Sequence, residues 1–223
     1  MSEGYLIAMI AISLPVLAVF GYGIKMFKYS PDELKPFFYF IFLSGIIEFG
    51  SKILWFLKLN NLPFLHLYVL LGFYFLSRFY QQMLDGFIDK WLINLMLYLF
   101  TAFTVINSTF IQPITTFNSF AVISESVFVV ILSLLTFMVM LEDVVKKKKI
   151  KLARSMNWIN SGLFIYYSSS LLIYYLNSFL FPDQSFRVFS REFHFQTWVL
   201  HGFFLLVMNF CFYLGLRFMP RQQ

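Results

Sequence analysis

Seven runs of apolar residues, separated by short polar breaks, divide the chain into segments of membrane-spanning length. A helix needs roughly 20 mostly apolar residues to cross the hydrocarbon of a bilayer. The apolar residues follow one another continuously and do not alternate with polar ones, so the pattern predicts helices and not a β-barrel. We therefore expect one all-α, polytopic helical bundle over residues 1–223. The seven spans are about 5–25, 36–58, 63–83, 91–107, 117–141, 156–181 and 193–216.

The fourth run is the shortest, and the link that follows it, Ser108 to Thr116, carries no charged residue. A bundle of six spans is therefore the alternative if residues 91–107 do not cross the bilayer. The sixth run is unusually polar, because tyrosines and serines are concentrated between Tyr166 and Tyr175. We expect at least one face of that helix to point into the bundle.

The composition excludes an ordinary water-soluble domain. Of the 223 residues, 60% are apolar and 13% are charged, and the mean hydropathy is +0.74. Soluble domains usually contain about 25% charged residues. The basic residues lie between apolar runs, where they act as orientation signals, so nothing favours a nucleic-acid partner. The single cysteine, Cys211, excludes a disulfide within one chain.

The positions of Lys and Arg predict the orientation in the membrane. With seven spans, most of the 17 basic residues fall on one side, including Lys146–Lys149, whereas Lys58, Arg187 and Arg191 fall on the other. Positive charge marks the cytoplasmic side. The amino terminus is therefore expected outside and the carboxyl terminus in the cytoplasm. The basic loop 143–155 is either this topology signal alone or a docking site for anionic lipid or a protein partner.

Ionisable residues inside the spans are the candidates for function. Each costs roughly 2.5–3.5 kcal/mol by insertion scales, so each needs a partner or a role. At about 1.5 Å per residue, all of them fall in the outer half of the bilayer once the orientation is assigned. We therefore predict one shared polar pocket open to the outside, and as its ligand-binding residues we take Glu48, Lys52, His66, Glu125 and His201.

Each of these residues also has a purely structural interpretation. Glu48 and Lys52 are four residues apart and can neutralise each other as an ion pair on one helix face. Glu125 can be a hydrogen-bonded buried acid, flanked by Ser124 and Ser126. His201 is either an interhelical hydrogen-bonding residue or a ligand group, and His194 is expected near the interface with water.

Three histidines and nearby carboxylates also provide adequate ligands for a catalytic zinc ion with an open position for water. The zinc ligands would then come from His66, His194, His201 and Glu48. The seven-helix ceramidase and progestin/adiponectin-receptor group uses such chemistry. That group has two histidines one turn apart on its last helix, whereas here His194 and His201 are separated by six residues. A lipid hydrolase is therefore an alternative and not the first hypothesis.

Retinal proteins are the other familiar seven-helix class with an external amino terminus. They need a lysine on the seventh helix for the Schiff base, and residues 193–216 contain none, which argues against a retinal cofactor. An internal repeat, which is typical of many transporters, is also not evident. A transporter or an accessory subunit of a membrane complex remains a further alternative.

The segment from Glu48 to Tyr68, with its Asn60-Asn61 turn and His66-Leu67-Tyr68, resembles uncharacterised seven-helix proteins of Bacteroidota. The final helix is similar as well, in Trp198-Val199-Leu200-His201 followed by Asn209. Related segments in that group often form the membrane part of sensory proteins, ahead of kinase or regulator domains. Six residues follow Arg217 in this sequence, so we expect no output domain, and the resemblance then implies signalling through a separate partner in a bacterial inner membrane.

The first hypothesis is accordingly a receptor-like or sensory membrane protein without catalytic activity. It would bind a small ligand or ion from the outside and contact a partner through the loop 143–155.

Overall fold

The chain folds into α-helices in the computed structural model, which describes residues 3–141, 150–175 and 187–220. Within these ranges there is no strand, and a helix is present in each of the seven predicted runs, so the predicted all-helical architecture is confirmed. A short 3-10 helix, η1 (Asp32–Leu34), leads into the second helix, and a π-helical turn, η2 (Asn107–Ile111), extends the fourth. The α-helices are α1 (Glu3–Phe27), α2 (Lys35–Phe56), α3 (Leu62–Met83), α4 (Lys90–Ile106), α5 (Ser119–Leu141), α6 (Ile150–Tyr175) and α7 (Arg187–Phe218).

Six of the helices in the described ranges are long and apolar enough to cross a membrane, namely all except α6. The short fourth run qualifies because η2 lengthens it to Ile111. Helix α6 is long, but it carries Asn157, Asn160 and the serines 168–170. It packs between α5 and α7, so several of these polar side chains face other helices. These features indicate a multi-pass integral membrane protein.

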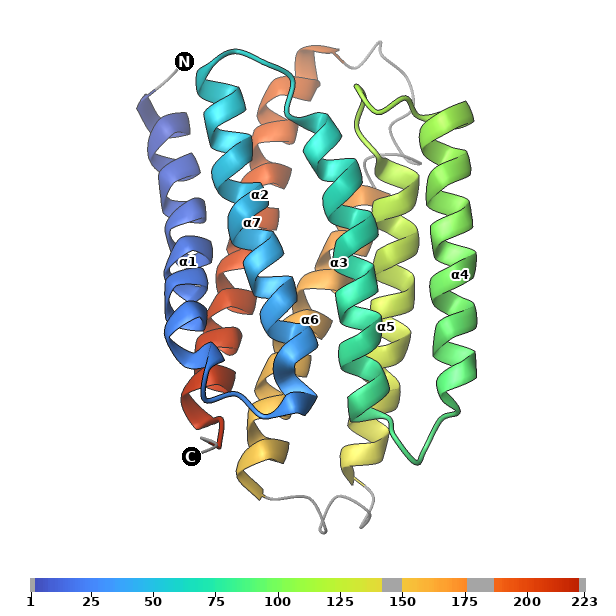
Figure 1. The fold of residues 1–223 in the computed structure, drawn as a ribbon. Coiled ribbons are helices and arrows are strands. Elements are labelled where there is room, and N and C mark those ends of the chain that lie inside the picture. The colour runs from blue at the N-terminus through green and yellow to red at the C-terminus, as the bar shows by residue number, and fades with distance from the viewer. Residues whose placement is uncertain (1–2, 142–149, 176–186, 221–223) are drawn as a thin grey trace.

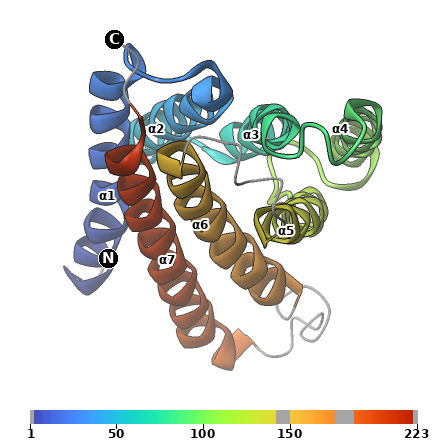
Figure 2. The same cartoon turned by 90° about the horizontal axis from the view of Figure 1, so that it is seen from below.

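Six helices form a closed ring in the order α1, α2, α3, α5, α6, α7, in which α7 packs back against α1. Helix α4 lies outside the ring and contacts α3 and α5 (Figures 1 and 2). The two chain ends lie at opposite ends of the bundle (Figure 1). We call these the amino-terminal end, with the α2–α3 turn and the η2–α5 link, and the carboxyl-terminal end, with η1 and the α3–α4 turn.

Local sequence signals set the helix boundaries. Pro36 and Pro63 lie in the first turns of α2 and α3, where a helix has no use for the missing N–H. Gly86, in the α3–α4 turn, has a φ of 81°, a conformation that side chains with a Cβ rarely adopt. Lys58 takes the left-handed conformation after α2, with a φ of 57°. The Leu59 amide then donates to the Leu54 carbonyl at 2.8 Å and closes the helix end.

The ring is filled by aromatic side chains in its carboxyl-terminal half and is joined by buried polar contacts. Phe37, on α2, packs edge-on against Phe212 of α7 with ring centroids 4.8 Å apart. The hydroxyl of Tyr80, on α3, lies 2.6 Å from Ser133 Oγ on α5 and donates to Asn160 Oδ1 on α6 at 3.1 Å. Three helices are therefore held in register by one buried tyrosine.

Helices α6 and α7 approach each other closely because small residues face one another. A Cβ placed on Gly162 would lie 2.8 Å from the Cβ of Cys211 and 3.1 Å from the Met208 carbonyl oxygen. Nearer the carboxyl-terminal end, Ser155 donates a 2.7 Å hydrogen bond to the carbonyl of Gly215. Small residues at such an interface are typical of helix packing in membranes.

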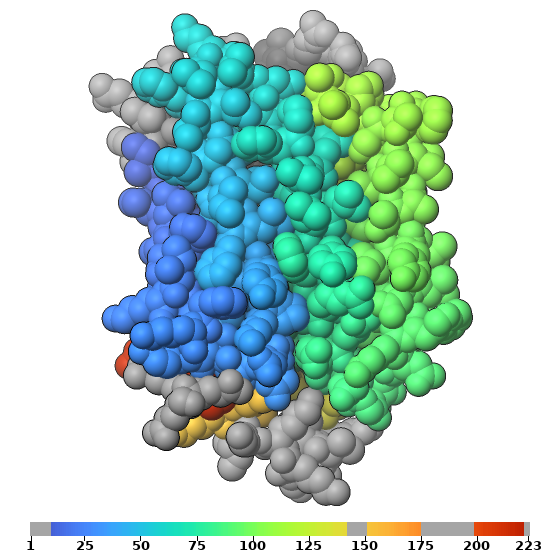
Figure 3. Space-filling model, viewed as in Figure 1, coloured from blue at the N-terminus to red at the C-terminus, as the bar shows by residue number. Residues whose placement is uncertain are grey.

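The outer surface of α1 to α4 forms one continuous face (Figure 3). Large apolar side chains are exposed along it, especially on α4, which touches the ring with one side only. Such an apolar exterior is compatible with contact to lipid tails. Exposed residues of α4 and η2 include Trp91, Leu92, Tyr98, Leu99, Val105, Ile106, Phe110 and Ile111.

Candidate functional site

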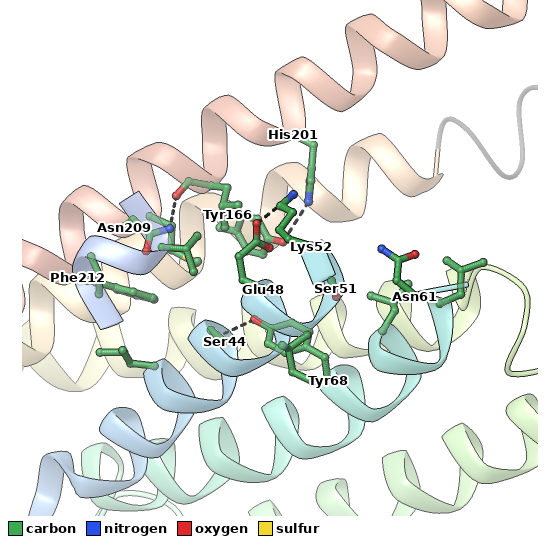
Figure 4. A pocket seen from close by; sticks show the side chains of 18 of the residues that line it. Ser44, Glu48, Ser51, Lys52, Asn61, Tyr68, Tyr166, His201, Asn209 and Phe212 are labelled. Atoms are coloured by element: carbon green, nitrogen blue, oxygen red, sulfur yellow. Dashed lines mark hydrogen bonds and ion pairs between the residues drawn. The ribbon is translucent and has the colours of Figure 1, made fainter. Parts of the chain in front are cut away.

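A cavity of about 330 Å³ lies inside the ring of helices, between α1, α2, α3, α6 and α7. This volume falls in the range of about 300–1,000 Å³ that is usual for small-molecule sites. Figure 4 shows its side chains converging from several helices. Its lining consists of Val16, Val19, Ile41, Ser44, Ile47, Glu48, Ser51, Lys52, Asn61, Leu62, Leu65, Tyr68, Phe117, Tyr166, His201, Leu205, Met208, Asn209 and Phe212.

The part of the cavity nearer the amino-terminal end carries both charges, beside Asn61, Leu62 and Leu65. Lys52 Nζ lies 3.2 Å from Glu48 Oε1, so the ion pair predicted from their spacing is present. The hydroxyl of Ser13, on α1, donates to the same Glu48 oxygen at 2.6 Å. The side chains of Lys52 and Glu48 remain 36% and 24% exposed. Both charged groups are therefore accessible from the cavity.

His201 faces the same region and is surrounded by hydroxyl groups of α6. Its Nε2 lies 3.1 Å from the hydroxyl of Tyr166 and 3.4 Å from that of Tyr174, and its Nδ1 lies 3.4 Å from Ser170 Oγ. The rings of Tyr166 and Tyr174 also pack against the imidazole, with centroids 5.1 and 5.4 Å away. His201 is thus an interhelical hydrogen-bonding residue, and it also lines the cavity.

The part nearer the carboxyl-terminal end is largely apolar. Ile41 and Phe212 lie there, each about 16 Å along its helix from Lys52 and His201 respectively, at about 1.5 Å per residue. Two polar side chains in this part donate to carbonyls of their own helices: Ser44 to Phe40 at 2.8 Å and Asn209 to Leu205 at 2.8 Å. The Ser44 hydroxyl, which also lies 3.3 Å from the Tyr68 hydroxyl, and one N–H of Asn209 are consequently engaged, and both charges of the cavity lie nearer its other end.

Glu125 does not line this cavity. Its side chain is 2% exposed on α5, and Tyr167 of α6 donates to its Oε1 at 3.0 Å. Tyr167 is adjacent in the chain to Tyr166, which does line the cavity. Glu125 therefore lies behind the residues that line the cavity, and its buried, hydrogen-bonded carboxyl agrees with the structural interpretation.

His66 also lies outside the cavity lining, although it was expected in the shared pocket. Its Nδ1 is 2.8 Å from Ser108 Oγ and its Nε2 is 3.0 Å from the Thr116 carbonyl oxygen. Both ring nitrogens are thus engaged by the link between α4 and α5. His66 attaches the first turn of α3 to this link.

The uncharged link itself is held together by amide side chains, which the search for charged residues did not reveal. Asn107 donates to Asn118 Oδ1 at 2.7 Å, and Gln112 donates to Ser119 Oγ at 2.7 Å. Asn60, in the α2–α3 turn, donates to the Thr115 carbonyl at 2.9 Å. The concentration of Asn, Gln, Ser and Thr over residues 107–119 was the signal available in the sequence.

Among the residues that the structure describes, the proposed zinc ligands do not lie together. Across those residues, no group of three His, Cys, Asp or Glu side chains is placed to hold a metal ion. The imidazole of His66 hydrogen-bonds to the α4–α5 link, that of His201 hydrogen-bonds to α6, and Glu48 pairs with Lys52. The side chain of His194 lies outside the described residues.

Residues 143–149 of the basic loop 143–155 lie outside the described residues. Its remainder forms the beginning of α6.

Comparison with known proteins adds no assignment: no protein family, no curated protein and no solved structure matches this chain.

Proposed function

We propose that this protein is a receptor-like integral membrane protein that binds a small organic molecule in the cavity between α1, α2, α3, α6 and α7. The observation that carries this proposal is the cavity itself, which contains an accessible ion pair at one end and apolar side chains at the other. Pockets with a mostly apolar wall and a few placed polar groups are the usual form of small-molecule sites.

In this proposal the amino-terminal end of the bundle faces outside, as the distribution of Lys and Arg predicts. The ligand enters from that side, and the inner basic segment around residues 143–155 contacts a separate signalling partner. The sensory part of the proposal rests on the short segments, Glu48 to Tyr68 and Trp198 to His201, in which the sequence resembles seven-helix proteins of Bacteroidota. The placement of His66 and His201 gives no support to the hydrolase alternative, so we do not adopt it.

The binding step is tested with protein in phosphatidylcholine nanodiscs and a panel of small water-soluble amphiphiles, with thermal unfolding as the readout. Ser51 lines the cavity, whereas Ile46 of the same helix is 62% exposed on the outer surface. We expect members of the panel to raise the melting temperature of the wild type and of Ile46→Phe, and to lose this effect in Ser51→Phe. A panel without any stabilising member, or equal stabilisation of Ser51→Phe, would refute the proposal.

A further inference from the structure

The arrangement of charged and apolar groups along the cavity restricts the class of ligand. We propose that the cavity binds a small zwitterion with an apolar side chain, of the α-amino-acid type, with its charged head at Glu48 and Lys52 and its side chain directed toward Phe212. This inference rests on the proposed function and specifies its ligand.

The head group follows from charge balance. Glu48 and Lys52 are the ionisable pair of the described lining that carries opposite charges, and Glu48 Oε1 forms the ion pair with Lys52 while it accepts a hydrogen bond from Ser13. A ligand that is only anionic draws Lys52 away and leaves the Glu48 carboxylate without its cation. A ligand that is only cationic pairs with Glu48 and leaves the Lys52 ammonium group without its anion. An unpaired charge in a membrane interior is costly, whereas a zwitterion pairs with both residues at once.

The order of the two charges also matters. On the same helix face, the backbone of Lys52 lies about 6 Å nearer the amino-terminal end than that of Glu48, and their charged atoms, Nζ and Oε1, are 3.2 Å apart. A ligand whose apolar part points to the carboxyl-terminal end therefore meets the carboxylate of Glu48 first and the amine of Lys52 second. Its cationic group must be at least as close to the apolar part as its anionic group. An α-amino acid meets this requirement because both groups are attached to one carbon atom.

The apolar part follows from the other end of the cavity. Ile41, Met208 and Phe212 provide its surface. The Ser44 hydroxyl and one N–H of Asn209 already donate to carbonyls of their own helices. An apolar or aromatic side chain can therefore lie against this surface, and burial of its apolar area favours the complex.

The test uses L-phenylalanine and the two molecules that each carry half of its head group: 3-phenylpropionate, which is only anionic, and 2-phenylethylamine, which is only cationic. Dissociation constants are measured on the full chain in phosphatidylcholine nanodiscs, with empty nanodiscs to subtract partitioning into lipid. We expect L-phenylalanine to bind at least tenfold more tightly than either half molecule, roughly the effect of one charge-assisted hydrogen bond. Each half molecule lacks one of the two charged groups and therefore loses one such bond.

Two variants, each of which removes one charge of the ion pair, should reverse the preference for L-phenylalanine over the half molecules. Glu48→Gln removes the partner of the ammonium group, so 3-phenylpropionate should bind this variant at least as tightly as L-phenylalanine does. Lys52→Met removes the partner of the carboxylate, so 2-phenylethylamine should gain in the same way. Lys58→Met removes a cation just beyond the end of α2, outside the cavity lining, and should leave all three constants unchanged.

The inference fails if a half molecule binds the wild type as tightly as L-phenylalanine, or if the two variants keep the wild-type order. It also fails if L-phenylalanine does not bind while other amphiphiles of the panel bind and depend on an open cavity at Ser51. That last result refutes the zwitterion and leaves the proposed function standing. Loss of binding by every member of the panel refutes both.

Discussion

The hydroxyl of Tyr167 on α6 donates a 3.0 Å hydrogen bond to the Glu125 carboxyl on α5, and both side chains are buried. This contact joins the two helices directly behind the wall that Tyr166 contributes to the cavity. Glu125 therefore has a defined structural partner at a position where the sequence suggested a ligand group.

Tyr167→Phe should lower the free energy of unfolding by roughly 0.6 kcal/mol, the average for hydrogen bonds between helices inside membranes, and by no more than about 1.7 kcal/mol. Thermal or denaturant unfolding in mild detergent measures this loss. Tyr98→Phe is the control, because Tyr98 is 67% exposed on α4. Glu125→Gln keeps an acceptor oxygen and should be milder than Glu125→Leu. Equal stability of Tyr167→Phe and the wild type would contradict a structural role for this bond.

His66 and His201 should respond differently to substitution. His66→Leu leaves Ser108 Oγ and the Thr116 carbonyl without their partner, so we expect a loss of about 1–3 kcal/mol in stability, with ligand affinity in the cavity unchanged. His201→Leu alters the cavity wall and should weaken L-phenylalanine binding. Unfolding curves and dissociation constants for both variants separate these effects. A larger loss of affinity in His66→Leu than in His201→Leu would reverse our assignment.

Close packing of α6 on α7 should not tolerate an added methyl group at Gly162. Gly162→Ala places a Cβ against the Cys211 Cβ and the Met208 carbonyl, and overpacking of this kind costs about 1–3 kcal/mol. Gly21→Ala is the matched control, since a Cβ on Gly21 has no neighbour within 4 Å. We expect a lower melting temperature for the first variant and no loss for the second. Comparable behaviour of the two would show that the helices separate easily.

The orientation in the membrane can be measured with single cysteines, because Cys211, the one natural cysteine, is buried and 5% exposed. Thr115 and Asp89 are exposed at opposite ends of the bundle. A membrane-impermeant thiol reagent added to intact cells should label Thr115→Cys, and should label Asp89→Cys only after permeabilisation. The opposite result would place the amino-terminal end in the cytoplasm and close the cavity to external ligands.

The sequence alone determines the helices of this protein. Apolar runs of about 20 residues have few alternatives to a helix in a membrane, because every backbone N–H and C=O must be paired within the segment. The same reasoning predicted the pairing of Glu48 with Lys52, since residues four apart share one helix face. Both results depend on local periodicity, which a chain displays directly.

Contacts between helices were decided by the tertiary structure. The sequence places His66, Glu125 and His201 in the same half of the bilayer, but depth does not specify which way a helix is rotated or which helix is its neighbour. The ring order places α4 outside and brings α7 against α1. As a result, His201 faces Glu48 and Lys52 across the cavity, Glu125 turns to Tyr167, and His66 is taken up by the α4–α5 link. Helix rotation and order arise from side-chain packing between distant segments, and no local pattern encodes them.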